Sequence, residues 1–441
     1  MADTLELARQ IPLPLSTPNF EIEEEGDTVH LNESSLPPVD GGFQAWSFLF
    51  ASFLTKASVQ GFPLSFGVFL EAYLKDPEYT NQPNASSLLP LIGPLASGII
   101  YCSGPFINMY ITRFPFHRRP AMWIGRAALM YYPSIAYMSE WFVRRRGLAN
   151  GAISAGTAAG GLIFPLFLPT LISSQGISKA LRYMSIGLVV SIAPMLPLVR
   201  GRLPEIRSPR ARAPARMMLG EKAWLTNMTF WVVLIANTLQ GFGYFVPVLW
   251  LPTFASALEI DATRASIALA MLNGGSAVGR VYLGYLCDKF DPWALSLATL
   301  IFTSLSTFIL WGVLSYSFAG LVAFGVVYGL LAGGYTSLWT GFFSDVGIQN
   351  DNPTHSTIIL GYLMFSRGIG NILSTPISTA LSSSRNSSST TPKADVHLGF
   401  GVDNGKYEKV IVYVGTCFAG AAVISLMGWA GEKRRANRHR Q

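Results

Sequence analysis

The sequence predicts an all-α, polytopic membrane protein. Of the 441 residues, 50% are hydrophobic and only 13% are charged, whereas an ordinary soluble domain carries about 25% charged residues. The apolar residues stand in blocks of roughly 20, the length at which a helix crosses the hydrocarbon core of a bilayer. Glycine and proline recur inside these blocks, and membrane helices tolerate both. The composition therefore implies that lipid, as well as water, surrounds the folded chain.

The first 39 residues are polar, poor in aromatic side chains and interrupted by prolines. This composition predicts a disordered tail, which we place in the cytosol. Its acidic stretch from Glu21 to Glu25 is unlike a cleavable signal peptide, which starts with basic residues. We therefore expect the first span to serve as its own insertion signal.

Apolar blocks define the candidate spans, which fall into two groups. The first group covers 43–73, 86–111, 121–140, 148–173 and 180–200, and the second covers 228–257, 264–287, 293–314, 317–344, 355–382 and 408–431. These groups predict an N-terminal helical bundle over 40–200, a cytosolic linker over 201–226, a C-terminal six-helix bundle over 227–431 and a basic cytosolic tail over 432–441. The linker and the tail are rich in arginine, and basic loops stay in the cytosol.

The segment 121–140 does not fit this topology as a single span. Basic residues flank it on both sides, Arg118 and Arg119 before it and Arg144 to Arg146 after it. Both clusters lie in the cytosol only if an even number of crossings separates them. The sequence therefore predicts about 11 transmembrane helices instead of 12, with a stretch of about one span absent near Arg126. A mispredicted splice site and a genuinely shortened protein are the two explanations.

Other features exclude several functional classes. The net charge of +7 comes from basic residues between the spans, so we expect no nucleic-acid partner. The cysteines Cys102, Cys287 and Cys417 lack the spacing of a metal site or a disulfide framework. The sequence has no P-loop, metal cluster or nucleophile constellation, so we expect neither an enzyme nor a cofactor. Asn84 and Asn386 lie in sequons of predicted external loops, which suggests glycosylation.

Three motifs give the chain a family resemblance. The segment 40–46 (DGGFQAW) precedes the first span, 141–151 (WFVRRRGLANG) lies between two spans, and Gly279-Arg280 is followed by Gly284 and Asp288-Lys289. With these motifs the chain resembles the major facilitator superfamily, and within it fungal proteins similar to monocarboxylate porters. The resemblance covers about residues 40–431, except for the absent piece.

This resemblance implies a transporter of two six-span bundles around a central cavity, which works by alternating access. It also implies gating roles at the cytosolic side for Arg280 and Asp288. We add Arg144 and Arg145 as a gate that pairs with Glu140, although the basic run can also act only as an orientation anchor. Small residues after the second motif, including Gly156 and Gly160, predict close helix packing, with an eased bend as the alternative.

Charges at bilayer depth indicate where a substrate binds. Lys56 lies near the middle of the first span, Arg367 near the middle of the eleventh, and Arg280 deep in the eighth. No acidic residue lies at comparable depth, so a central cavity lined by these cations would suit an anionic substrate. Snorkelling of Lys56 and structural bonding of Arg367 are the alternatives.

Polar side chains in spans seven and eight are further candidates. Asn237, Gln240 and Tyr244 share one helix face at i, i+3 and i+7, and Asn273 is the polar residue of span eight. We expect these four residues to line the cavity, with interhelical hydrogen bonding as the alternative.

The chain also departs from the animal monocarboxylate porters. Leu64 follows Phe62-Pro63 where those porters carry a lysine, and Ser276 stands where they carry an aspartate one turn before the arginine. Proton-coupled lactate transport by that route is therefore not expected.

The leading hypothesis is a secondary transporter of a small organic anion in the plasma membrane, with both termini cytosolic. The alternatives are an efflux pump for a fungal secondary metabolite, a non-functional truncated transporter and a non-transporting sensor. The sequence specifies neither substrate, direction, coupling ion nor oligomeric state.

Overall fold

The computed structural model describes most of the chain after the first 36 residues. The described residues are 37–114, 117, 132, 134, 137, 138, 140–202, 223–343, 353–383 and 398–440. The predictions for the N-terminal tail, most of the linker, most of 121–140 and Asn386 fall on residues outside these ranges. We call the described residues up to 202 the first half and those from 223 onward the second half.

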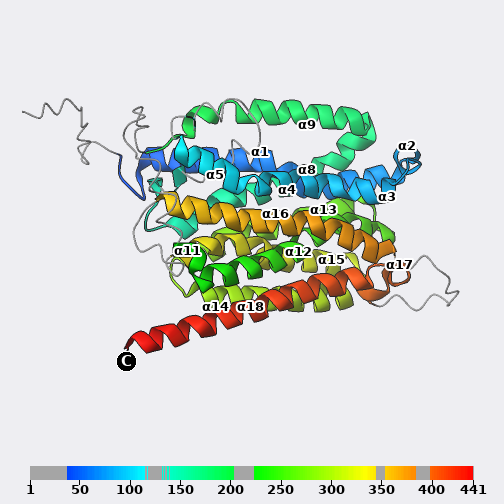
Figure 1. Cartoon of the computed structure of the whole chain (residues 1–441). Helices are drawn as coiled ribbons and strands as arrows, with labels where there is room; N and C mark the ends of the chain where they lie inside the picture. Colours follow the sequence, from blue (N-terminus) through cyan, green and yellow to red (C-terminus); the bar gives the residue numbers. More distant parts are fainter. Residues whose placement is uncertain are drawn as a thin grey trace, which may run out of the picture. The chain divides into compact units, whose positions relative to one another are not determined.

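Every regular element in the described residues is a helix. The first half contains α1 (Gly42–Lys75), α2 (Pro77–Thr80), α3 (Ala85–Leu88), η2 (Leu89–Leu91), α4 (Ile92–Cys102), α5 (Gly104–Arg113), α8 (Arg146–Gln175), α9 (Ile177–Ile192) and η4 (Leu196–Leu198). The long helices run side by side and roughly parallel (Figure 1). The predicted span 86–111 is divided at Ser103, between α4 and α5.

The second half has the same all-helical character. It contains α11 (Ala223–Thr226), α12 (Met228–Ala257), α13 (Ala262–Cys287), α14 (Pro292–Ser306), η5 (Thr307–Leu314), α15 (Phe318–Tyr328), η6 (Gly329–Gly333), η7 (Gly334–Phe343), α16 (Pro353–Ser383), η8 (Gly399–Gly401), α17 (Val402–Gly405) and α18 (Glu408–Arg440). Helix α18 continues through the predicted basic tail because that tail is rich in the good helix formers Ala, Arg, Lys and Glu.

Seven of the described helical segments are long and apolar enough to cross a membrane, which confirms the prediction of a polytopic all-α membrane protein. Helices α1, α13 and α16 are not among these seven segments but are of similar length, at 34, 26 and 31 residues. Each of them carries one buried cation, namely Lys56, Arg280 or Arg367. The total of about 11 spans stays a prediction, because 121–140 lies largely outside the described residues.

Small residues bring α1 and α8 together. A Cβ added to Gly156 would overlap the Phe53 carbonyl oxygen, and one added to Gly160 would overlap that of Ala57. Close approach of this kind suits membrane helices, whose association depends on van der Waals packing rather than on hydrophobic burial. The structure thus confirms close packing as the role of these glycines.

The first two motifs are joined at one end of the first half. The Asp40 carboxylate accepts hydrogen bonds from the backbone N–H groups of Val143, Arg144 and Arg145 at 3.0, 3.1 and 3.2 Å. The Asp40 N–H in turn donates to the Trp141 carbonyl oxygen at 2.9 Å. The start of α1 is therefore fixed to the segment that leads into α8.

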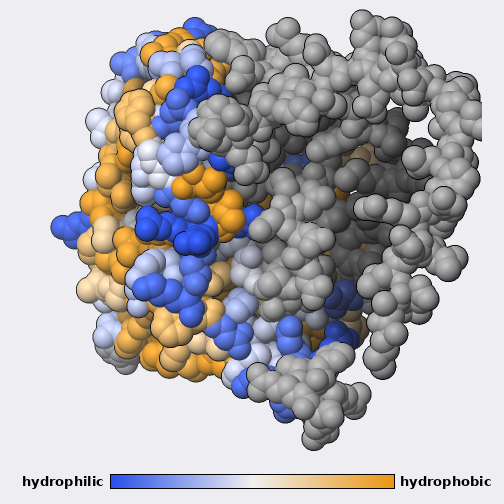
Figure 2. Space-filling model, turned by 90° about the vertical axis from the view of Figure 1, so that its left-hand side faces the viewer, coloured by the Kyte–Doolittle hydropathy of each residue, from blue (hydrophilic) through white to orange (hydrophobic). Residues whose placement is uncertain are grey.

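That end of the helices also carries α11 and the end of α18. In the part of this face that Figure 2 colours, hydrophilic residues gather in the middle and hydrophobic residues follow the rim. Such a pattern is what a helix bundle presents where it leaves the bilayer, with water at its end and lipid around its sides.

Candidate functional site

A polar cavity lies between the two halves and is divided into two small compartments. The Lys56 compartment is lined by Lys56, Gln60, Tyr101, Asn150, Ser154, Thr157, Arg280, Thr336, Trp339 and Met364. The Asn371 compartment is lined by Gln60, Pro63, Leu64, Ser97, Tyr101, Thr157, Tyr244, Phe245, Arg280 and Asn371. Their volumes are about 20 and about 10 Å³, close to what a single water molecule needs. The space left in each compartment is therefore too small for an organic substrate.

Arg280 lies where the two compartments meet, since it lines both. Its Nη1 donates to the Ser154 carbonyl oxygen on α8 at 2.5 Å, and its Nε donates to the Gly333 carbonyl oxygen at 3.0 Å. The side chain is 5% exposed. The sequence analysis gave Arg280 a gating role and also counted it among the cations at bilayer depth. The structure places it on the cavity wall, about 12 Å along α13 from Asp288 at 1.5 Å per residue, and its gating role stays a prediction.

Arg367 is held by α12 through a hydrogen bond and an aromatic face. Its Nη1 donates to Gln240 Oε1 at 2.5 Å, and its Cζ lies 4.1 Å from the centre of the Tyr244 ring. The Tyr244 hydroxyl accepts a hydrogen bond from Arg280 Nη2 at 3.2 Å, so this tyrosine stands between two cations. Gln240 and Tyr244 therefore meet Arg367 from one face of α12, as their spacing predicts. Tyr244 lines the Asn371 compartment, whereas Gln240 and Arg367 are in the lining of neither compartment.

The cavity has an excess of positive charge. Lys56 on α1 is 2% exposed and shares its compartment with Arg280. None of the described residues that line either compartment is acidic. Cations at this depth are costly unless an anion or a polar partner compensates them. An anionic ligand would supply the missing negative charge.

Asn237 and Asn273 lie outside both compartments and connect helices instead. The Asn237 Nδ2 donates to the Leu363 carbonyl oxygen and to Ser366 Oγ, both at 2.7 Å. The Asn273 Nδ2 donates to the Gly161 carbonyl oxygen at 3.0 Å. Both therefore make the interhelical hydrogen bonds that the sequence left open as the alternative.

Asp288 connects the two halves at the end that carries Asp40. Its Oδ1 accepts from the Gly147 N–H at 2.8 Å and its Oδ2 from the Leu148 N–H at 2.9 Å. These N–H groups belong to the first turn of α8, where the helix has unsatisfied donors and a partial positive charge. A Cβ on Gly284 would overlap the Gly147 carbonyl oxygen. This contact therefore joins the two halves, and we call it the latch; a gating role for Asp288 stays a prediction.

The other predicted gating residues are Arg144, Arg145 and Glu140. The side chains of Arg144 and Arg145 are exposed, and their backbone N–H groups bind Asp40. The Glu140 Oε2 lies 2.7 Å from the position that a Cβ on Gly201 would take. A pairing of Glu140 with the arginine run stays a prediction.

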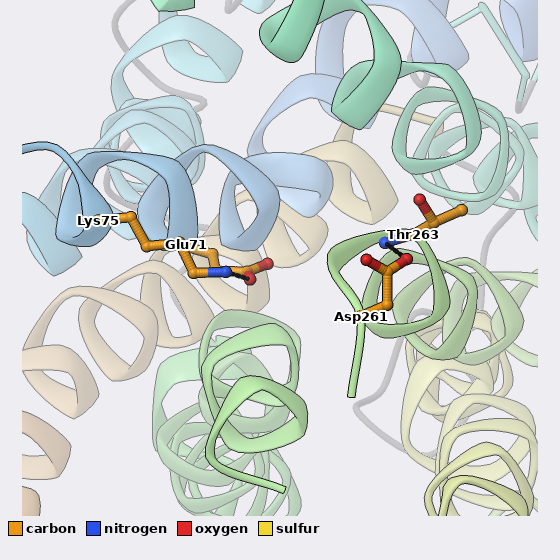
Figure 3. A network of polar contacts seen from close by, with 4 residues as sticks. All are labelled: Glu71, Lys75, Asp261 and Thr263. Carbon is orange, nitrogen blue, oxygen red and sulfur yellow. Dashed lines mark hydrogen bonds and ion pairs between the residues drawn. The ribbon is translucent and has the colours of Figure 1, made fainter. Parts of the chain in front are cut away.

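At the opposite end, two polar pairs fix the ends of α1 and α13 (Figure 3). Glu71 accepts a hydrogen bond from Lys75 at 2.7 Å, and Asp261 accepts one from the Thr263 N–H at 3.0 Å. Glu71 is 5% exposed, and the sequence analysis did not single it out. It lies about 22 Å along α1 from Lys56 at 1.5 Å per residue. This acid therefore does not neutralise the central cations.

Two cavity residues that the sequence analysis missed stand one helical turn beyond residues it found. Gln60 follows Lys56 at i+4 and Asn371 follows Arg367 at i+4, and both line the cavity. That spacing puts each pair on one helix face. A search for polar residues one turn from each intramembrane cation would have found both.

Asn84 is exposed and adopts a left-handed conformation with φ of 62° just before α3. Its loop follows the end of α1 that is opposite to Asp40. The exposure suits a glycan, and glycosylation there stays a prediction. The second sequon, at Asn386, lies outside the described residues.

Comparison with known proteins identifies a family. Residues 124–375 match the family model described as "Major Facilitator Superfamily". This match covers more than half of the chain and includes most of the helices around the cavity.

Similar proteins are known in filamentous fungi. The chain is 25% identical to the "MFS-type transporter pynF" of Aspergillus niger, over 94% of each chain. It is 24% identical to the "MFS transporter asaE" of Aspergillus flavus, over 78% of this chain and 81% of that protein. It is also 24% identical to the "Fujikurins efflux protein" of Gibberella fujikuroi, over 68% and 69%.

Two solved structures share the fold. The major facilitator transporter FucP in its outward conformation aligns with a TM-score of 0.54 and 13% identity, over 88% of this chain and 98% of that one. An outward-facing bacterial homologue of the iron transporter ferroportin aligns with a TM-score of 0.56 and 11% identity, over 88% and 99%. At this identity the likeness shows the fold alone.

Proposed function

Because this chain belongs to the Major Facilitator Superfamily, we propose that it exports an anionic organic metabolite by alternating access. The chain is a multi-pass membrane transporter, and its family carries small molecules across membranes. The direction, the charge of the substrate and the mechanism are the proposed parts.

One observation supports the anionic substrate above all others. Lys56, Arg280 and Arg367 are each at most 5% exposed. Lys56 and Arg280 line the cavity, whose described lining residues include no acid, and Arg367 lies behind Tyr244, which lines the Asn371 compartment. In a medium of low dielectric constant, unbalanced positive charge attracts an anion strongly. A carboxylate or a similarly charged group is the natural counter-ion.

Similarity to fungal transporters supports export. One relative is named as an efflux protein, and others are named as transporters of the same superfamily. An exporter of this kind would bind its substrate from the cytosol and release it outside. We place the protein in the plasma membrane with both termini cytosolic and with glycans at Asn84 and Asn386.

Alternating access requires a gate on each side of the cavity. The latch between Asp288 and the first turn of α8 would close the cytosolic side. Arg144 and Arg145 precede Gly147 in the chain, and together with Glu140 they would control how readily the latch opens. Loading of substrate then requires that these contacts break and that the halves part.

A second candidate function is uptake of a short carboxylate. The small, polar Lys56 compartment favours it, because a compact polar cavity suits a compact polar anion. Comparing metabolites inside and outside cells with and without the gene separates the two. Export predicts that the deletion retains an organic acid inside the cell, and uptake predicts that it leaves one in the medium.

The test of the anion site is Arg367→Ala in the full-length protein. We expect loss of nearly all transport of the retained acid, because truncation leaves the substrate charge uncompensated in the membrane. Surface expression should persist, and Arg367→Lys should keep part of the activity because it keeps the charge.

The matched control is Arg264→Ala, which removes an exposed arginine near the start of α13. Transport should stay normal in that variant. Unchanged transport in Arg367→Ala would refute the assignment of this residue to the substrate. Absence of transport in the unmodified protein, despite normal surface expression, would favour the non-functional alternative.

A further inference from the structure

Asn371 on α16 is a buried carboxamide without a partner. The residue is 0% exposed, and neither its Nδ2 nor its Oδ1 has a hydrogen-bond partner. The neighbouring Ser374 hydroxyl donates to the Asn371 backbone carbonyl oxygen rather than to the side chain. Because buried polar groups are nearly always bonded, this one needs an explanation.

The other buried asparagines of the second half differ from Asn371. The Nδ2 of Asn237 donates two hydrogen bonds to α16, and the Nδ2 of Asn273 donates two to backbone carbonyls. Neither residue lines a compartment. Asn371 combines an unmet donor, an unmet acceptor and a place on a cavity wall, which is the arrangement expected of a ligand contact.

The cavity offers two chemically different ends. Lys56 and Trp339 line only the Lys56 compartment, and the Trp339 Nε1 is a further buried donor without a hydrogen-bond partner. The Asn371 compartment is mostly apolar at its own end, with Pro63, Leu64 and Phe245. Arg280 lines both compartments. A ligand that fills both would place an acid near Lys56 and an apolar body near Asn371.

A carboxamide presents a donor and an acceptor side by side. Its bidentate complement is a group with an acceptor beside a donor, such as a lactam, another cis amide or a primary carboxamide. An ester, a lactone or a ketone supplies only the acceptor. We infer that the transported acid carries such an amide group and that Asn371 recognises it.

This inference rests on the proposed function and narrows its substrate class to acids that contain an amide. Between transport events a water molecule can occupy the Asn371 compartment, since about 10 Å³ is near the volume that one water needs. The substrate would displace this water when the two halves part and close again around it.

The test uses matched probes and the full-length protein in lipid nanodiscs. The probes are (5-oxopyrrolidin-2-yl)alkanoic acids with one to four methylene groups before the carboxylate, together with the corresponding lactones. Each lactone keeps the acid and the shape but lacks the N–H. Affinity is measured by calorimetry for the wild type, Asn371→Leu, Asn371→Asp and the control Ser382→Ala.

At the best linker length, we expect the wild type to bind the lactam at least ten-fold more tightly than the lactone, because the lactone leaves the Asn371 acceptor unpaired. Asn371→Leu should reduce this ratio to about one while lactone binding persists. Ser382 is a buried polar residue of the same helix that lines neither compartment, and its hydroxyl donates to the Thr379 carbonyl oxygen, so Ser382→Ala should keep the wild-type ratio.

Several outcomes would overturn the inference. Equal binding of lactam and lactone by the wild type would mean that water alone satisfies Asn371. A lactam preference that survives in both Asn371 variants would place the amide elsewhere, and failure of every probe to bind would exclude the class. Methyl esters of the same probes test the proposed function separately. Tight binding of the esters would contradict the anion site but leave the amide preference intact.

Discussion

At the residue scale, the buried arginines are held by dipoles and aromatic rings. Arg367 donates to Gln240 and lies over the Tyr244 ring, while Gln240 Nε2 donates to the Ala332 carbonyl oxygen at 3.2 Å. Arginine stays charged in proteins, so this environment stabilises the cation without neutralising it. Each guanidinium group is therefore held in place, and its positive charge remains available to a ligand.

Tyr244 is the residue that couples the two arginines, and its ring and hydroxyl have separable roles. Tyr244→Phe removes the acceptor for Arg280 Nη2 but keeps the ring beneath Arg367. We expect a roughly ten-fold rise in the KM for transport, since a hydrogen bond to a charged group contributes about 1.5–3 kcal/mol. Radiotracer flux measured over a range of substrate concentrations checks this.

Tyr244→Leu also removes the cation–π contact with Arg367. A further loss of about 2 kcal/mol is expected for a desolvated pair, so this variant should be clearly weaker than Tyr244→Phe. Equal effects of the two substitutions would show that the ring contributes nothing to the site.

At the element scale, the predicted span 317–344 is not one regular helix. It changes from the α-helix α15 to the π-helix η6 and then to the 3-10 helix η7. Where the helix type changes, some backbone carbonyl groups lose their regular hydrogen bonds within the helix. Those of Ala332 and Gly333 accept hydrogen bonds from Gln240 and Arg280. The irregularity therefore supports Arg280, which lines the cavity, and Gln240, which holds Arg367.

Close packing of α1 on α8 also belongs to this scale. Gly160→Ala should lower the apparent Tm in detergent, because its Cβ would overlap the Ala57 carbonyl oxygen and force the helices apart. Overpacking of this kind costs about 1–3 kcal/mol. Thermal unfolding followed by the fluorescence of a cysteine-reactive dye measures the shift.

Gly187→Ala on α9 is the matched control, because a Cβ there meets nothing within 4 Å. That variant should keep or raise the Tm, since alanine is the better helix former. A Tm for Gly160→Ala equal to that of Gly187→Ala would mean that α8 moves aside freely.

At the scale of the whole molecule, contacts between the halves run beside the cavity. Helix α8 of the first half packs along α13 of the second. The latch of Asp288 on Gly147 and Leu148 fastens the end of that pair. Alternating access would require this interface to open at one end while the other end stays closed.

Asp288→Asn should favour the state that is open to the cytosol. The substitution removes a negative charge from the positive end of α8, a contribution of about 0.3–2 kcal/mol. A cysteine placed at Asn150, which lines the cavity and is 5% exposed, should then react several-fold faster with a maleimide added from the cytosolic side. The three native cysteines are first replaced.

Asp291→Asn is the control for the latch. Asp291 accepts hydrogen bonds from the Trp293 N–H and from Trp429 Nε1, all within the second half. Its substitution should leave the labelling rate at position 150 unchanged. A labelling rate that rises equally in both variants would indicate general loosening rather than release of a latch.

The sequence located most of the helices and the buried cations. Blocks of apolar residues encode the spans directly, because each block must match the thickness of the membrane. Lys56 and Arg367 stand out because charges are rare in such blocks. The sequence could not distinguish Gln240, which contacts Arg367, from Asn237, which binds the backbone of α16. Both are polar and lie on the same face of one helix.

The sequence by itself therefore determined an all-helical membrane protein with positive charge inside its membrane region. Only the tertiary structure decided that Arg280 lies at the junction of two compartments, that Asp288 caps α8 and that Asn371 faces a cavity without a partner. The physical reason is the separation along the chain between the residues that produce each feature. Helix periodicity and hydrophobic length are local properties of the chain, whereas cavities and latches arise where helices distant in sequence pack against one another.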